Sequence, residues 1–222
     1  MSFKMHSKGR TGIRLKFFLA VLSLLFFIPL FIFKGIGPFD FWWWLSFNLI
    51  ILIAIILLFD RDFIKVIMDD FNNKLFIKIS VGLISAVFLY FIFYAGNVLS
   101  KTLSPSSQAG IADVYRFRES ASPLRITLLM LLIIGPGEEL YWRGFIQRVF
   151  SDRYGAAIGF VFATSLYTLI HVASTNPMLV LAAFICGLFW GTLYRWKSSM
   201  VLNMFSHILW DISVFIVFPF KA

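Results

Sequence analysis

The chain has 222 residues, of which 60% are hydrophobic and 19% aromatic, whereas only 14% are charged. An average soluble domain has about 25% charged residues. A soluble protein of this composition would therefore lack the polar residues needed to cover its core. The single Cys excludes a disulfide-rich scaffold, and 14 Gly with 7 Pro exclude a collagen-like chain. The composition predicts an integral membrane protein.

A net charge of +9 would suggest nucleic-acid binding in a soluble domain. Here the basic residues lie mostly in short segments between apolar runs, where they contact lipid headgroups and set the topology. We therefore expect the lipid bilayer, and no nucleic acid, among the partners of this chain.

Long apolar runs recur along the chain, and about 20 helical residues suffice to cross a bilayer. We expect spans at Ile13–Phe33, Phe41–Phe59, Leu75–Leu99, Leu124–Phe150, Ala156–Ala173, Pro177–Tyr194 and Ser199–Phe218. The predicted fold class is all-α, a polytopic transmembrane helical bundle of about seven spans. The fourth run contains Gly135–Pro136–Gly137, which we expect to break the helix or to begin a new one before Glu138.

The connections between the runs predict organisation and orientation. The longest polar stretch, Ser100–Pro123, divides an N-terminal three-span region (1–123) from a C-terminal four-span core (124–222). With seven crossings, 14 basic residues lie on the side of the N-terminus and six on the other side. The positive-inside rule then places the N-terminus in the cytoplasm and the C-terminus outside, in a plasma (inner) membrane. Asp60–Lys74 has apolar residues at helical spacing and predicts a short helix in the membrane interface.

Ionisable residues inside the apolar runs are the exceptions that need an explanation, because each costs about 3 kcal/mol at a bilayer centre by insertion scales. Lys16 and Lys78 lie near the ends of their runs, where long side chains can reach the interface. The six that remain all fall after residue 123: Glu138, Glu139, Arg143, His171, His207 and Asp211. Structural hydrogen bonds between helices explain any one of them as well as a function does. Six such residues on three helices favour a functional site.

Helical spacing sorts these residues. Glu139 and Arg143 are four apart and face each other as an ion pair. Glu138 is rotated from Glu139 by about 100°, so it points to a different neighbour and is available for chemistry. His207 and Asp211 also share one helix face, as do Tyr167 and His171.

The spacing predicts different depths in the membrane for His171 and His207. At 1.5 Å per residue, His171 lies about 22 Å from the start of its run and His207 about 12 Å. The two would lie at different depths if both runs begin at the same face, unless the helices tilt or begin later.

Three short motifs now resemble a known family. Glu138 to Arg143 reads EELYWR and fits EExxxR, within the run GPGEELYWRGFIQ. Tyr167 and His171 fit FxxxH with Tyr for Phe, and His207 with Asp211 fits HxxxN in an HxxxD form. In this order, over Leu124–Phe218, they resemble the CAAX-protease and bacteriocin-processing family of intramembrane proteases (CPBP, also called ABI).

The resemblance implies an intramembrane endopeptidase that cleaves a membrane-associated peptide or protein tail. In it, Glu138 and His171 would activate a water, His207 and Asp211 would stabilise the oxyanion, and Glu139 and Arg143 would support the site. The family was first described as metalloproteases, and the spacing does not decide. We expect no cofactor, with zinc on Glu138, His171, His207 and Asp211 as the alternative, since these are acceptable ligands. The signatures HExxH, GxSG and GxGD of other intramembrane proteases are absent.

Asp211 departs from the motif with a chemical consequence, because an ionised Asp cannot donate a hydrogen bond to an oxyanion as Asn can. Either Asp211 orients a protonated His207, or Asp211 is itself protonated. Two other functions stay open. A proton-relay or transporter-like protein would use the same residues but would spread polar groups over both halves of the chain, often in an inverted repeat, and neither is present. A non-catalytic immunity or scaffold protein would keep the fold alone.

Overall fold

The computed structural model describes residues 13–60, 62–103 and 105–220. In chain order its elements are α1 (Ile13–Phe33), β1 (Gly35–Ile36), β2 (Phe39–Asp40), α2 (Phe41–Phe59), α3 (Phe63–Asn72), α4 (Leu75–Leu103), α5 (Pro105–Tyr115), η1 (Arg116–Ser120), α6 (Pro123–Leu129), η2 (Met130–Ile134), α7 (Gly135–Glu139), η3 (Leu140–Gln147), α8 (Arg148–Tyr154), α9 (Ala156–Val172), α10 (Pro177–Lys197), α11 (Met200–Ile212) and η4 (Ser213–Val217). The expected all-α polytopic bundle is confirmed. The strands form only a two-residue antiparallel hairpin, in which Gly35 pairs with Asp40.

Each apolar run expected to span the membrane coincides with a helix or with a continuous helical run. By length and composition, four helices of the described chain qualify as membrane spans: Phe41–Phe59, Leu75–Thr102, Pro177–Lys197 and Met200–Val217. The segments Ser106–Ser120 and Pro123–Tyr154 qualify only as a pair, which is bent by 95° and counts as a fifth span if it is taken as one. The first and fifth predicted spans correspond to shorter apolar helices, Phe17–Phe33 and Ala156–Val172.

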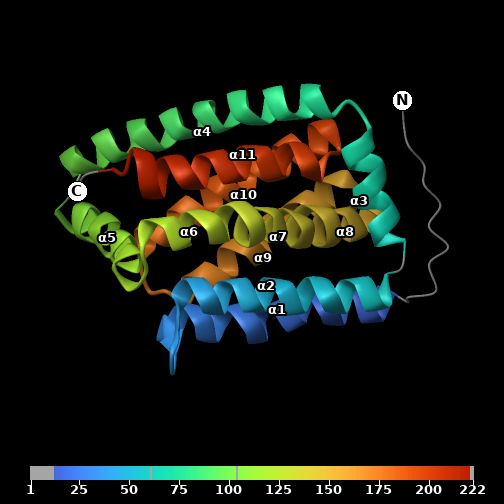
Figure 1. Cartoon of the computed structure of the whole chain (residues 1–222), viewed down its shortest axis with the longest axis horizontal. Coiled ribbons are helices and arrows are strands. Elements are labelled where there is room, and N and C mark those ends of the chain that lie inside the picture. Colours follow the sequence, from blue (N-terminus) through green and yellow to red (C-terminus); the bar gives the residue numbers. More distant parts are fainter. Residues whose placement is uncertain (1–12, 61, 104, 221–222) are drawn as a thin grey trace.

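The helices pack around a central run, α6 to α8 (Figure 1). In this view α4 lies along α11 on one side of that run, and α1 and α2 lie side by side on the other. Helices α9 and α10 pack against each other, and α9 also contacts η3 and α8. The segment that carries Glu138 and Glu139 therefore lies at the centre of the bundle, with other helices around it.

The fourth run corrects one expectation, because the helix does not break at Gly135–Pro136–Gly137. It continues from Pro123 to Tyr154, so the two glutamates lie in mid-helix and not in a first turn. Pro136 has no N–H to donate, and a π-helical turn, Met130–Ile134, ends directly before Gly135. That turn changes the hydrogen-bond register, since the N–H of Gly135 bonds to the carbonyl of Met130.

The two glycines serve close packing and not a break. A Cβ on Gly135 would lie 2.6 Å from Cγ1 of Ile208 in α11, and one on Gly137 would lie 3.2 Å from Cβ of Leu49 in α2. The absence of side chains at these positions lets α7 approach both neighbouring helices. Sequence spacing alone does not separate this use of glycine from a helix break.

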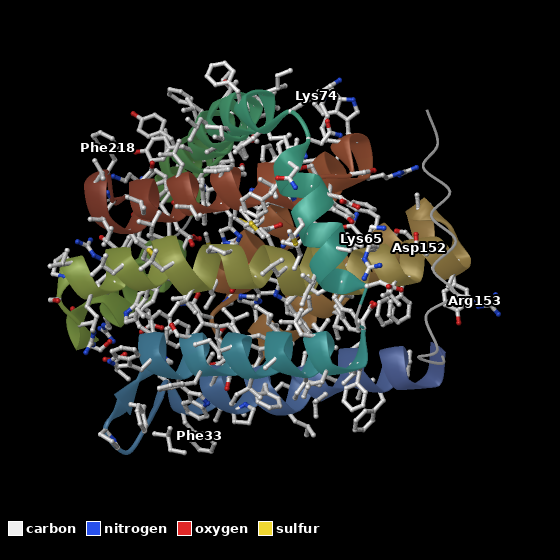
Figure 2. All side chains as sticks on the ribbon, turned by 45° about the vertical axis from the view of Figure 1, so that its right-hand side comes forward. Phe33, Lys65, Lys74, Asp152, Arg153 and Phe218 are labelled. Atoms are coloured by element: carbon white, nitrogen blue, oxygen red, sulfur yellow. The ribbon has the colours of Figure 1, made fainter. Side chains whose placement is uncertain are left out.

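The predicted helix between the second and third spans is confirmed as α3, which buries Phe63 and exposes Ile64 and Met68. The end of the molecule that holds α3 also holds α8 (Figure 1). Figure 2 shows Lys65, Lys74, Asp152 and Arg153 at this end, and Phe33 and Phe218 at the other. Of the basic residues behind the predicted orientation, Lys4, Lys8, Arg10, Arg61 and Lys221 lie outside the described residues.

Ion pairs join the N-terminal helices to the C-terminal core. Asp40 caps the N-terminus of α2 by accepting from the N–H of Trp42 at 3.0 Å, and its carboxylate also pairs with Arg125 of α6. At the other end of α2, Asp60 accepts from Arg148 of α8 at 3.0 Å. Such part-buried pairs fix the register of α2 against the central run.

Close contact between α4 and α11 gives a first prediction. A Cβ on Gly82 would lie 2.7 Å from the backbone oxygen of Leu202, so Gly82→Ala must separate the two helices. We expect a loss of about 1–3 kcal/mol, measured as a lower midpoint of thermal unfolding in detergent. Gly96→Ala is the matched control on the same helix, because a Cβ there meets nothing within 4 Å. Equal midpoints for both variants would contradict this packing.

Candidate active site

Four predicted site residues line one cavity of about 240 Å³. They are Glu138 of α7, His171 of α9, and His207 and Asp211 of α11. The different distances of His171 and His207 along their helices therefore do not separate them. The remaining walls are mainly apolar and include side chains from helices before residue 123, such as Phe31, Trp42 and Ile92.

Glu139 is fully buried and is not among the residues that line this cavity. Its Oε1 accepts from Arg143 Nη1 at 3.0 Å and from His207 Nδ1 at 2.8 Å. Its Oε2 accepts from Asn203 Nδ2 at 3.1 Å. The predicted Glu139–Arg143 pair is therefore present, and both carboxylate oxygens of Glu139 are occupied by protein groups.

Glu138 points elsewhere, as the helical rotation predicts. Its Oε2 accepts from the Tyr167 hydroxyl at 3.1 Å and lies 3.9 Å from His207 Nε2. No cation of the described residues is within ion-pair distance of this carboxylate, apart from His207 when protonated. Glu138 lines the cavity and is 9% exposed. One of the two adjacent carboxylates is thus held by the protein, and the other faces open space.

His207 is held by two contacts. Its Nδ1 bonds to Glu139, and its ring stacks on Trp190 with centroids 3.7 Å apart. Its Nε2 therefore faces the cavity, 3.6 Å from Asp211 Oδ2. That separation is longer than a hydrogen bond, so Asp211 leaves Nε2 free to bond with another group.

His171 is held by its own helix. Its Nδ1 lies 2.7 Å from the carbonyl oxygen of Tyr167. A carbonyl can only accept, so Nδ1 carries the proton and Nε2 of the neutral ring is the free acceptor. The ring also packs against Phe31, with centroids 4.5 Å apart. Tyr167 thus contacts both Glu138, through its hydroxyl, and His171, through its carbonyl.

Two residues of the site are absent from the sequence-based set. Asn203 bonds to Glu139 and to the carbonyl oxygen of Trp190 at 2.8 Å. Trp190 supports His207 by stacking. The sequence could have predicted Asn203, because it is a polar residue in an apolar run and precedes His207 by four residues. Nothing in the sequence distinguished Trp190, since this chain has many aromatic residues.

The geometry also bears on the zinc alternative. Within residues 13–60, 62–103 and 105–220, no group of three or more His, Cys, Asp or Glu side chains is placed to hold a metal ion. The cavity is lined by two carboxylates, Glu138 and Asp211, and by the imidazoles of His171 and His207. Such a set can accept a proton from a water molecule and donate hydrogen bonds to a developing negative charge.

Comparisons with known proteins identify the segment that holds the site. Residues 120–213 match the family model described as "Rce1-like: Type II CAAX prenyl endopeptidase Rce1-like". The six predicted site residues, Glu138 to Asp211, all lie within that match. Neither the search of curated proteins nor the search of solved structures gave a match.

The buried carboxylate gives a second prediction. Arg143→Met leaves Glu139 without its permanent cation, and breaking a buried pair in this way costs about 3–5 kcal/mol. We expect a lower unfolding midpoint in detergent, which the double variant Glu139→Gln/Arg143→Met partly restores because no unpaired charge then remains. Arg153→Met, at an exposed position, is the control. A double variant less stable than Arg143→Met would show that the pair is not the source of the effect.

Proposed function

We propose that this chain, whose residues 120–213 match the model of the Rce1-like type II CAAX prenyl endopeptidases, is an intramembrane endopeptidase that hydrolyses a peptide bond near the end of a membrane-associated protein. Members of the family are peptidases, and the chain is an integral membrane protein. The single observation that carries the proposal is the cavity that Glu138, His171 and His207 share with apolar walls.

In the proposed reaction Glu138 and His171 activate water. A water molecule between them donates one hydrogen bond to the Glu138 carboxylate and another to His171 Nε2, the two acceptors that face the cavity. As the water oxygen attacks the scissile carbonyl carbon, Glu138 takes its proton. The C–N bond then breaks, and the same proton passes to the leaving amine. Tyr167 supports this step, because its hydroxyl bond holds the Glu138 carboxylate in place.

His207 is the proposed partner of the oxyanion. The Nδ1–H of His207 donates its hydrogen bond to Glu139. When the ring is protonated, its Nε2–H therefore points into the cavity. Asp211 at 3.6 Å favours that protonated form by its charge. Of the two possibilities opened by Asp in place of Asn, we therefore favour an Asp211 that orients and stabilises a charged His207.

We propose a metal-free mechanism and a defined topology. The orientation rests on the uneven distribution of Lys and Arg, with the N-terminus in the cytoplasm, the C-terminus outside and seven crossings in the plasma (inner) membrane. The substrate is proposed to be a peptide or protein tail held at the membrane. A prenylated CAAX tail, a modified Cys followed by three residues, is the chemistry in the family description.

A third prediction tests the chemistry in purified protein reconstituted in liposomes. The probe is an internally quenched peptide that ends in farnesyl-cysteine and three apolar residues, and a second probe lacks the farnesyl group. We expect Glu138→Gln and His171→Ala each to lower kcat at least a hundredfold, since each removes a water-activating group. Glu119→Gln makes the same chemical change at an exposed position and should keep full activity.

The outcomes separate the alternatives. Full activity in both site variants would overturn the proposed roles, whereas activity lost on adding a chelator and restored by zinc would favour a metal mechanism. Cleavage of both probes at equal rates would show that the lipid is not recognised. A proton flux into the liposomes that needs Glu138, without cleavage, would favour a proton relay.

A fourth prediction tests the topology. In a Cys186→Ala background, Lys197→Cys and Phe218→Cys place single thiols at the two exposed ends of the C-terminal helices. We expect an impermeant maleimide to label Phe218→Cys on intact cells, and to label Lys197→Cys only after permeabilisation. The reverse pattern would invert the proposed orientation, and labelling of both on intact cells would change the number of crossings.

A further inference from the structure

One wall of the cavity comes from outside the segment that matches the family. This surface, which we call the α4–α5 wall, consists of Ile92, Phe93, Gly96, Asn97, Ile111, Val114 and Tyr115. It is apolar except for Asn97 and Tyr115. Its place relative to the site is fixed by Phe93, whose ring packs on Trp210 with centroids 4.8 Å apart, next to Asp211 in the chain.

The Oδ1 atom of Asn97 lacks a hydrogen-bond partner. The residue is only 9% exposed, and its buried Oδ1 accepts no hydrogen bond from the described residues. Trp210 is in the same condition, since its buried Nε1–H also has no acceptor there. Among described side chains with such an orphaned polar atom, these two are the ones that line the cavity. One is an acceptor and the other a donor, and leaving either unpaired is costly.

Tyr115, the other polar residue of the wall, already has protein partners for its hydroxyl group. Its hydroxyl donates to the carbonyl oxygen of Val214 at 3.0 Å and accepts from the N–H of Phe220 at 2.9 Å. The Tyr115 hydroxyl therefore braces the wall, while Asn97 remains available to a bound molecule.

Gly96 leaves space beside the amide. On the same helix, Gly82 is required by contact with α11, but a Cβ on Gly96 would meet nothing within 4 Å. Gly is among the weakest helix formers, and no close helix contact explains it here. Its effect is to widen the cavity at the position next to Asn97.

A peptide in this cavity needs hydrogen-bond partners for its main chain, and the unpaired atoms of Asn97 and Trp210 can supply them. Its main-chain N–H and C=O groups leave water on entry and require partners. The surrounding helices use their own main-chain groups internally, so side chains must provide the partners. Asn97 Oδ1 can accept from a peptide N–H, and Trp210 Nε1–H can donate to a peptide carbonyl oxygen.

We propose that Asn97 and Trp210 bind the main chain of the substrate beside the scissile bond, and that Gly96 leaves room for it. This inference rests on the proposed peptidase function and assigns part of its substrate binding to the region before residue 123. Recognition through main-chain groups aligns a tail without reading its side chains. The apolar side chains of the tail then pack against the remaining residues of the α4–α5 wall.

The test measures KM and kcat separately with the farnesylated probe. We expect Asn97→Ala and Trp210→Phe each to raise KM about tenfold with kcat within twofold, because each loses one hydrogen bond to the substrate. Gly96→Leu should also raise KM by filling the space. Asn72→Ala, at an exposed position of α3, is the matched control and should leave both constants unchanged.

Ester-for-amide probes distinguish binding from a structural role. Each probe of a series replaces one peptide N–H beside the scissile bond by an ester oxygen. We expect one of them to raise KM about tenfold for the wild-type chain and to have no further effect on Asn97→Ala.

Other results would overturn the inference. It fails if every ester probe affects wild type and Asn97→Ala equally, or if the variants lose thermal stability while KM is unchanged. If the wild-type chain cleaves the probe and Asn97→Ala has the wild-type KM, only this inference is rejected and the proposed function stands. A wild-type chain that cleaves neither the farnesylated nor the unmodified probe rejects the proposed function and this inference together.

Discussion

The buried carboxylate of Glu139 is the constraint on which the centre of this molecule depends. An ion inside an apolar bundle is tolerated only when paired and hydrogen-bonded, and three side chains meet that requirement here. Two of them, Asn203 and His207, come from α11, so satisfying the charge also docks α11 against the central run. Asn203 extends the network to the main chain of α10 through the carbonyl of Trp190.

The same constraint divides the work between two adjacent glutamates. Because consecutive helical residues are rotated by about 100°, Glu138 cannot share the partners of Glu139. It faces the cavity, where its one hydrogen bond from Tyr167 leaves the other oxygen open to a small molecule. The Glu139 bond to His207 also turns Nε2 of that ring toward the same space. A structural ion pair thus positions the groups that we propose to be reactive.

Much of this arrangement could be predicted from the sequence, because the rules concerned are local. Hydropathy located the helices, and i,i+4 spacing placed Glu139 with Arg143. Locality also explains the main error, at Gly135–Pro136–Gly137. Those residues usually end helices, but here a preceding π-helical turn and the neighbouring Ile208 and Leu49 give them a different use. The number of residues along a helix did not show that His171 and His207 share a cavity, since depth depends on how each helix lies in the bundle.

The sequence by itself determined the membrane class, the helical segments and the set of ionisable residues, because a bilayer makes each charge in an apolar run conspicuous. Only the tertiary structure decided which side chains complete the cavity. Asn97, Phe31 and Trp210 are ordinary residues of apolar helices until the bundle brings α1, α4 and α11 together. The physical reason is that the partner of a buried polar atom is chosen by distance in space, and packing between distant helices sets that distance.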